Sequence, residues 1–183
     1  VQQDGDALMR ASKDLRADRE VMLTAVQQNG RALYYASEEL QADREVVLAA
    51  VQQCGYVLKV ASKELRADRE VVLAAVQHEY FTWYPVLQHA SPELRADREV
   101  VLAAVEHDGW GGRSLGYASP ELRADREVVM AAVRQRGLAL EYASEALRAD
   151  SEVVGAAVQQ HGPAAALHSL VRPRGYPPGF RLG

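Results

Sequence analysis

The sequence predicts an all-α fold, an α-solenoid of about six helical repeats that are each 25–29 residues long. The first observation is the motif Ala-Asp-Arg-Glu-Val, whose aspartates, counting one variant copy at the end, lie at positions 18, 43, 68, 97, 125 and 150. The second is a serine motif with the same spacing, at positions 12, 37, 62, 91, 119 and 144. The third is a short apolar run in every copy, with helix-start signals and no strand pattern. Units this short cannot bury their apolar residues alone, so the copies are expected to stack on one another.

Each copy is expected to contain one main α-helix of about three turns. Asp43 directly precedes the apolar run of residues 46–51, and its carboxylate can accept backbone N–H groups of the first turn, as an N-cap residue does. Glu45 adds negative charge where the helix dipole favours it. Gly55 follows the run and is expected to take the left-handed conformation of a helix C-cap. The run is apolar almost all round, which predicts a helix packed between two neighbours.

A shorter helical segment is expected between this glycine and the next aspartate. The spacing Leu-x-x-Ala-Ser recurs in every copy, and proline follows the serine at Ser91 and Ser119. Serine at the N-cap with proline in the first helical position is typical of a helix start, so we expect a short turn there, in part 3-10. The arginines beside the capping aspartates are expected to form charge ladders between neighbouring helix starts. They are Arg19, Arg44, Arg69, Arg98 and Arg126.

Composition and charge exclude several classes of protein. Of the 183 residues, 48% are hydrophobic and 25% are charged, which is typical of soluble domains. The formal net charge of -4 argues against a general nucleic-acid-binding protein, which would carry a basic stripe. No apolar run approaches the length of a membrane span. Cys54 is the single cysteine, so no internal disulfide is expected and nothing points to secretion. Residues 1–5 nearly repeat residues 26–30, so we expect the chain to begin within a repeat.

Two turns between copies are longer than the others and carry many of the aromatic residues. The turn around residues 79–85 is about four residues longer, and the turn around residues 108–113 is about three residues longer. The flanking copies stay in phase, so these insertions are expected to bulge outward, where Trp and Tyr make good interface anchors. The alternative is that Phe81 and Trp83 fold back to cover a widened gap between copies. The candidate partner-binding residues in the two turns are Tyr80, Phe81, Trp83, Tyr84, Trp110 and Arg113.

The C-terminal end divides from the repeats in composition. Residues 1–171 are expected to form the solenoid, and residues 172–183 an extended basic tail rich in proline and glycine. A segment of this composition has no core of its own, so we expect it to lie against a partner or back along the solenoid. Its candidate partner-binding residues are Arg174, Tyr176, Phe180 and Arg181.

No constellation of residues in the sequence indicates an enzyme. The repeated Asp and Glu residues recur in six equivalent places, which is typical of helix caps rather than of an acid–base site. His78, His89 and His107 flank the longer turns but lack the spacing of a metal site. Cys54 has no neighbouring histidine to activate it, and the glycines of residues 109–112 do not follow a strand as a phosphate loop would. We therefore expect no catalytic residues, no metal and no cofactor.

Two stretches of the chain carry the repeat in its most complete form. They are Ala-Asp-Arg-Glu-Val-Val-Leu-Ala-Ala-Val from Ala42 to Val51, and Gln-Gln-Asn-Gly-Arg-Ala-Leu-Tyr-Tyr-Ala-Ser-Glu-Glu-Leu from Gln27 to Leu40. This pattern resembles the DUF4116 repeat family over nearly all of residues 1–170. That family is abundant in algae and other protists and has no established activity, so the resemblance implies a repeat scaffold of such origin without catalytic residues. The unit is also similar in architecture to leucine-rich-variant repeats, which implies a right-handed superhelix.

These observations favour a non-catalytic scaffold that holds other protein subunits, as an accessory or structural subunit of a larger assembly. The algal resemblance implies an organellar assembly, such as a photosystem or a respiratory complex in a chloroplast or mitochondrion, with this chain at most peripheral to the membrane. One alternative is a free adaptor that binds short peptides along the edge formed by the variable turns. A second is a ligand-binding or regulatory solenoid with a pocket beneath the longer turns.

Overall fold

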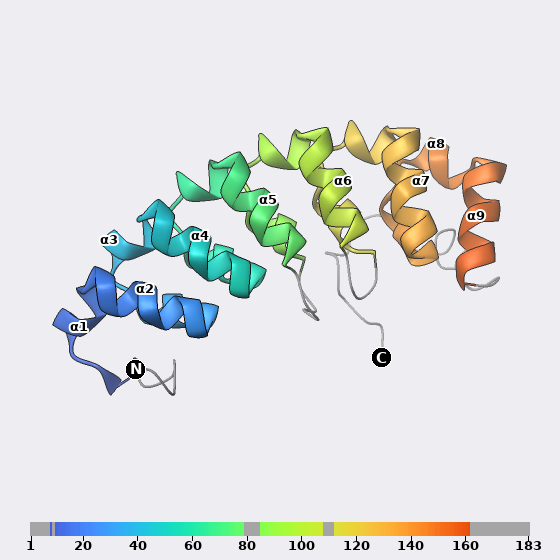
Figure 1. Ribbon diagram of the computed structural model, residues 1–183. Coiled ribbons are helices and arrows are strands. Elements are labelled where there is room, and N and C mark those ends of the chain that lie inside the picture. The colour runs from blue at the N-terminus through green and yellow to red at the C-terminus, as the bar shows by residue number, and fades with distance from the viewer. Residues whose placement is uncertain (1–7, 9, 79–84, 108–111, 162–183) are drawn as a thin grey trace, which may run out of the picture.

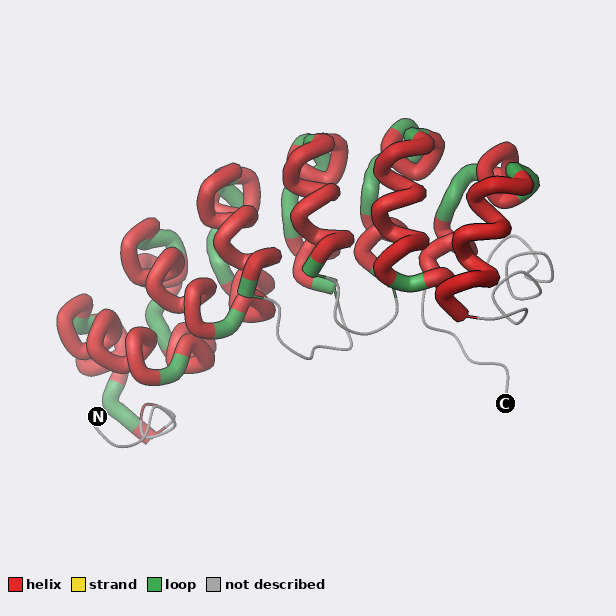
Figure 2. Tube along the Cα trace, turned by 45° about the vertical axis from the view of Figure 1, so that its right-hand side comes forward, coloured by secondary structure: helices red, strands yellow, loops and turns green. Residues whose placement is uncertain are grey.

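The computed structural model describes residues 8, 10–78, 85–107 and 112–161. All the regular elements within these residues are helical. Figure 1 shows the main helices following one another along a curved arch, from α2 at one end to α9 at the other. Figure 2 shows the same copies as successive windings of the chain that stand side by side. The predicted all-α repeat solenoid is confirmed.

Each copy contributes a 3-10 helix, a short helical turn and a main α-helix, in that order. The main helices are α2 (Arg19–Gln28), α4 (Arg44–Gln53), α5 (Arg69–Gln77), α6 (Arg98–Glu106), α7 (Arg126–Gln135) and α9 (Ser151–His161). The 3-10 helices are η2 (Gly30–Tyr35), η3 (Gly55–Val60), η5 (Val86–His89), η7 (Ser114–Tyr117) and η9 (Gly137–Tyr142). The short turns are α1 (Lys13–Ala17), α3 (Glu38–Gln41), η4 (Leu65–Ala67), η6 (Leu94–Ala96), η8 (Leu122–Ala124) and α8 (Glu145–Arg148). The predicted tail and the rest of residues 162–183 lie outside the described residues.

Local hydrogen bonds explain where the helices begin. Asp68 Oδ1 accepts the backbone N–H groups of Glu70 and Val71 at 3.0 and 3.1 Å, and so caps α5. Ser62 Oγ accepts the N–H of Leu65 at 3.3 Å, where the short turn begins. The equivalent aspartate and serine make the same bonds in the other copies. These bonds span only two or three residues, so they recur wherever the motif recurs, and the predicted caps are confirmed.

The core lies between the row of main helices and the row of 3-10 helices. Each main helix packs against the next main helix and against the 3-10 helices beside it. The buried residues of α4 are Val46, Val47, Ala50 and Val51. The leucine of each 3-10 helix, such as Leu58, reaches the core from the other side and is fully buried. The apolar runs are therefore packed between neighbours, as predicted. Among the described helices, none is both long enough and apolar enough to cross a membrane.

A backbone hydrogen bond joins each copy to the next. The N–H of Ser91 donates to the carbonyl oxygen of Arg66 at 2.9 Å, and the N–H of Ser119 donates to the carbonyl oxygen of Arg95 at 2.8 Å. Both boundaries contain a longer turn, yet the bond is the same as the one from Ser62 to the carbonyl of Gln41, where the turn is short. The insertions therefore leave the stacking register of the copies unchanged.

A ladder of ion pairs runs along the starts of the main helices. Arg44 Nε lies 2.8 Å from Asp68 Oδ2, and a second guanidinium nitrogen of Arg44 contacts Glu70. Arg19, Arg69 and Arg98 contact the aspartate and glutamate of the following copy in the same way. Arg126 uses one terminal guanidinium nitrogen, which lies 2.5 Å from Glu152 Oε2 and 3.7 Å from Asp150 Oδ1. The predicted charge ladder is confirmed.

The glycine after the main helix has a different role from the one that the sequence predicts. Gly55 begins the 3-10 helix η3, and the only glycine with positive φ among the described residues is Gly112, at 65°. A Cβ atom on Gly55 would overlap the carbonyl oxygen of Ala75 in α5, and one on Gly30 would overlap that of Ala50 in α4. The expected left-handed cap at Gly55 is therefore wrong. Glycine is needed there because the backbone passes too close to the following main helix for a side chain.

Candidate partner-binding face

The copies differ mainly on one side of the solenoid. Residues 44–51, 69–76 and 98–105 of the main helices have the same sequence, whereas the 3-10 helices vary. We call the side formed by η2, η3, η5, η7 and η9 the 3-10 face. The position after its buried leucine holds Tyr34, Lys59, Gln88, Gly116 and Glu141, and the next position holds Tyr35, Val60, His89, Tyr117 and Tyr142.

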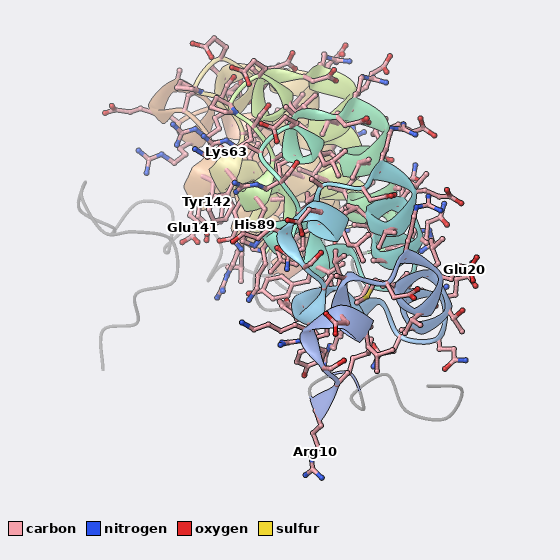
Figure 3. All side chains as sticks on the ribbon, turned by 90° about the vertical axis from the view of Figure 1, so that its left-hand side faces the viewer. Arg10, Glu20, Lys63, His89, Glu141 and Tyr142 are labelled. Carbon is pink, nitrogen blue, oxygen red and sulfur yellow. The ribbon has the colours of Figure 1, made fainter. Side chains whose placement is uncertain are left out.

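Figure 3 shows this division in a view from the N-terminal end of the stack. His89, Glu141 and Tyr142, which come from η5 and η9, lie on one side of the molecule. Glu20 of α2 lies on the opposite side. His89, Glu141 and Tyr142 of the 3-10 helices therefore lie on the opposite side of the molecule from the start of α2.

Four side chains from three copies meet on the 3-10 face. Lys59 Nζ lies 5.0 Å from the ring centre of Tyr34 and 4.7 Å from that of Tyr56, which is cation–π range. The same nitrogen lies 3.4 Å from the Tyr56 hydroxyl oxygen. The Tyr56 ring also meets the imidazole of His89 in an edge-to-face arrangement, with ring centres 5.5 Å apart and an angle of 66° between the ring planes. We call Tyr34, Tyr56, Lys59 and His89 the Lys59 cluster.

The charge state of the Lys59 cluster is set by burial and by its basic neighbours. Burial, together with the positive charges of Lys59 and Arg66, lowers the pKa of His89 to about 4. His89 is therefore neutral near pH 7, and its Nε2 is buried without a hydrogen-bond partner among the described residues. Burial also raises the pKa of the Tyr34 hydroxyl, so that this ring stays neutral as well. The cluster thus combines neutral aromatic surface with the cations of Lys59 and Arg66.

A second close contact on the 3-10 face joins the last two copies. A Cβ atom built on Gly116 would lie only 2.8 Å from Cδ1 of Tyr142. The absence of a side chain at Gly116 therefore makes room for the half-buried ring of Tyr142 from the next copy. Together with the Lys59 cluster, this contact shows that side chains on the 3-10 face pack across copy boundaries.

Most of the residues that the sequence nominates for partner binding lie outside the described residues. This applies to Tyr80, Phe81, Trp83, Tyr84 and Trp110 in the longer turns, and to Arg174, Tyr176, Phe180 and Arg181 in the tail. Arg113 is described and half-buried, and its carbonyl oxygen accepts the N–H of Gly116 at 2.9 Å. It precedes η7 and so lies at the start of a 3-10 helix.

The Lys59 cluster was not foreseen from the sequence. Part of its signal was nevertheless present: the two positions after the invariant leucine, which hold Tyr34, Lys59 and His89, change from copy to copy, while residues 44–51, 69–76 and 98–105 of the main helices are identical. Two residues considered for metal binding or nucleophilic chemistry, His78 and Cys54, lie at junctions between helices. His78 accepts the N–H of Gly55 on its carbonyl oxygen at 3.1 Å, and Cys54 is half-buried at the start of η3. Within the described part of the chain, no group of three or more His, Cys, Asp or Glu residues could hold a metal ion.

Comparison with known families accounts for the repeats. The family model described as "Domain of unknown function (DUF4116)" matches residues 1–41, 43–95, 81–123, 97–148 and 125–166. These successive, partly overlapping matches follow the copies along the stack and confirm the resemblance seen in the motif. No curated protein and no solved structure matches the chain.

Proposed function

The chain belongs to the DUF4116 family, and we propose that it acts as a non-catalytic scaffold whose 3-10 face holds other proteins. In its fuller form the proposal is an accessory or structural subunit of a larger assembly, such as an organellar photosynthetic or respiratory complex. The observation that carries it is the concentration of sequence variation on one face of an otherwise regular stack.

The contrast between the two sides of the solenoid supports this proposal. Stacking requires the caps, the buried leucines and the ion-pair ladder, and these are the same in nearly every copy. Stacking does not require Lys59 or Glu141, since the equivalent positions of other copies hold Tyr34, Gln88 and Gly116. A repeat protein that presents a different side chain from each copy can match a partner whose groups differ along its length.

The chemistry of the 3-10 face also suits protein partners. Tyrosine rings supply large contact areas at low entropic cost and are enriched in interface hot spots. Tyr34, Tyr35, Tyr117 and Tyr142 are all half-buried on this face, so part of each ring is left for a partner to cover. The longer turns and the tail, with their aromatic and basic residues, are further proposed contacts.

Site-specific cross-linking during native purification tests the proposal. A photo-reactive amino acid is placed at Gln88 on the 3-10 face or, as a matched control, at Gln52, which is exposed on α4. The protein is purified from its source under gentle conditions, and covalent adducts are identified by mass spectrometry. We expect a defined protein to be cross-linked from Gln88 at fixed stoichiometry, and no equivalent adduct from Gln52.

Two other outcomes have clear meanings. If the chain elutes alone near its own mass of 20.1 kDa and Gln88 gives no protein adduct, the scaffold proposal is wrong. If it elutes alone but the residue at position 88 is cross-linked to partner proteins at low occupancy, the partners bind reversibly. The chain is then a free adaptor rather than a permanent subunit. Loss of the Gln88 adduct after mutation of the Lys59 cluster would place the contact on that cluster.

A further inference from the structure

The solenoid carries two rows of arginines, which differ in whether their side chains form ion pairs. The first row, described above, is paired with carboxylates of the following copy at every described boundary. The second row lies two residues before each capping aspartate. Its members are Arg16, Arg66, Arg95, Arg123 and Arg148, and the second copy has Gln41 instead.

Three consecutive members of the second row make no ion pair with any described residue. Arg66, Arg95 and Arg123 are half-buried, and the Nε atom of each is buried without a hydrogen-bond partner. Their backbone carbonyl oxygens are used, since Ser91, Ser119 and Ser144 of the following copies donate to them. The backbone of the row is thus held firmly in the stack, while no residue that the structure describes accepts a hydrogen bond from these three Nε atoms.

The nearest carboxylates are already engaged elsewhere. Glu64, Glu93 and Glu121 each lie two residues before an arginine of the row. The pKa of each glutamate is lowered mainly by hydrogen bonds from its own backbone N–H and from the serine that caps the same turn. The arginines contribute only at longer range, and none forms an ion pair with its glutamate. The glutamates are therefore engaged within the short turns and do not complete the arginine row.

An aromatic residue of the next copy accompanies each of these arginines. The bond from the Ser91 N–H to the Arg66 carbonyl brings His89, two residues before Ser91, near Arg66, whose charge helps to lower the pKa of His89. The same backbone bond joins Ser119 to Arg95 and Ser144 to Arg123, and Tyr117 and Tyr142 each stand two residues before those serines in the sequence.

At one copy boundary, the second-row arginine and the aromatic residue of the next copy are both replaced. Where the second row has Gln41 instead of arginine, the position in the next copy holds Val60 instead of an aromatic residue. Gln41 there turns inward, and its side-chain nitrogen donates to the carbonyl oxygens of Leu33 and Ala36 at 3.3 and 3.2 Å. Stacking at this position is therefore satisfied by glutamine and valine, so an arginine–aromatic pair is not required for it.

We propose that these arginine–aromatic pairs bind the carboxylate groups of an extended acidic segment of a partner protein, one pair at each of the copy boundaries that follow Arg66, Arg95 and Arg123. A guanidinium group presents a planar fork of donors that matches a carboxylate, and a neighbouring tyrosine can add a hydroxyl donor or a stacking surface. Several weak contacts in register reinforce one another, because the second contact forms at high effective concentration. The inference rests on the proposed function and specifies the chemistry of the partner.

The test measures binding of a fluorescein-labelled oligoglutamate peptide to the full 183-residue chain by fluorescence anisotropy. The double variant Arg66→Gln with Arg95→Gln uses the residue that the chain itself carries at position 41, so folding is preserved. The control variant, Arg10→Gln with Arg134→Gln, changes the net charge equally at two exposed arginines outside the row. Arg10 points away from the body of the stack in Figure 3.

We expect saturable binding that weakens with salt and falls about tenfold or more in Arg66→Gln with Arg95→Gln, but little in the control. Absence of binding, or equal losses in the two double variants, would overturn the inference. Preferential binding of a single-stranded oligonucleotide over oligoglutamate would overturn it as well, in favour of a phosphate ligand. The scaffold proposal is judged separately. An adduct at Gln88 without oligoglutamate binding supports the scaffold and rejects the acidic partner. Oligoglutamate binding without an adduct at Gln88 rejects the scaffold alone.

Discussion

Arg44 and Asp68, which are 24 residues apart in the sequence, form an ion pair in which Nε and Oδ2 are 2.8 Å apart. The other oxygen of the same aspartate caps α5 by accepting two backbone N–H groups. One carboxylate therefore starts a helix and ties that helix to the previous copy. The guanidinium is 47% exposed, so solvent screens the ion pair, whereas the cap satisfies backbone donors that no other group serves.

Removal of the cap is expected to cost more than removal of the ion pair. Asp68→Ala leaves two N–H groups of α5 without their acceptor and should lower the free energy of unfolding by about 1 kcal/mol. Arg44→Gln keeps the cap and should have a smaller effect. Asp68→Ser keeps a capping oxygen without the charge and should recover most of the loss. Urea unfolding followed by circular dichroism compares the three variants, and equal losses in Asp68→Ser and Asp68→Ala would show that charge is the larger contribution.

His89 makes stability fall as the solution is acidified. Its pKa is lowered from 6.5 to about 4 in the folded protein, so the folded state binds fewer protons than the unfolded state between these values. The free energy of unfolding should therefore decrease as the pH falls from about 6.5 towards 4. A decrease on the order of 2 kcal/mol is expected after allowance for partial exposure. Thermal unfolding across this pH range measures it.

His89→Tyr is the matched variant for the pH effect, because tyrosine occupies the same position at Tyr35, Tyr117 and Tyr142. The variant should be nearly flat between pH 6.5 and 4. A separate loss should remain below about pH 4. It arises because hydrogen bonds from Arg44 and from backbone N–H groups lower the pKa of Asp68, and the stabilisation is lost as that carboxylate is protonated. An unchanged slope above pH 4 in His89→Tyr would contradict the assignment to His89.

Two glycines should respond in opposite ways to the same substitution. In Gly55→Ala the new methyl group meets the carbonyl of Ala75, so the 3-10 helix and α5 must separate, at a cost of about 1–3 kcal/mol. Gly155 lies in α9 with nothing within 4 Å of a Cβ atom, so Gly155→Ala should stabilise the protein by up to about 1 kcal/mol through helix propensity. Chemical unfolding of both variants measures the difference. A neutral Gly55→Ala would mean that the backbone contact is looser than the structure shows.

Two leucines test the position of the core. Leu58 of η3 is fully buried in the core. Leu58→Ala should destabilise the protein by about 2–5 kcal/mol, because the substitution leaves a cavity. Leu15 at the start of the stack is 47% exposed, and Leu15→Ala should cost about 1 kcal/mol or less. The change in side chain is the same in both variants, so urea unfolding isolates the effect of burial. Similar losses at the two sites would show that the first copy is packed as tightly as the interior.

The repeat length, the helix starts and the buried residues could all be predicted from the sequence. Asp68 and Ser62 bond to N–H groups two or three residues away, and the buried valines follow the helix start in a short run. Such relationships are local, so a motif that recurs also recurs in structure. The ion-pair ladder could be predicted too, because Arg44 and Asp68 occupy equivalent positions of neighbouring copies in a stack.

The tertiary structure decided the role of Gly55 and the composition of the candidate site. Gly55 is required because its backbone lies close to Ala75 of α5, 20 residues later in the sequence. The local sequence around the glycine does not reveal this contact. The Lys59 cluster draws Tyr34, Tyr56 and His89 from three copies, and whether their rings meet depends on the distance and rotation between copies. The sequence by itself determined the unit and its repetition, because these follow from local bonds and periodicity. Only the stacked structure decided which variable side chains touch, because that depends on the geometry between units.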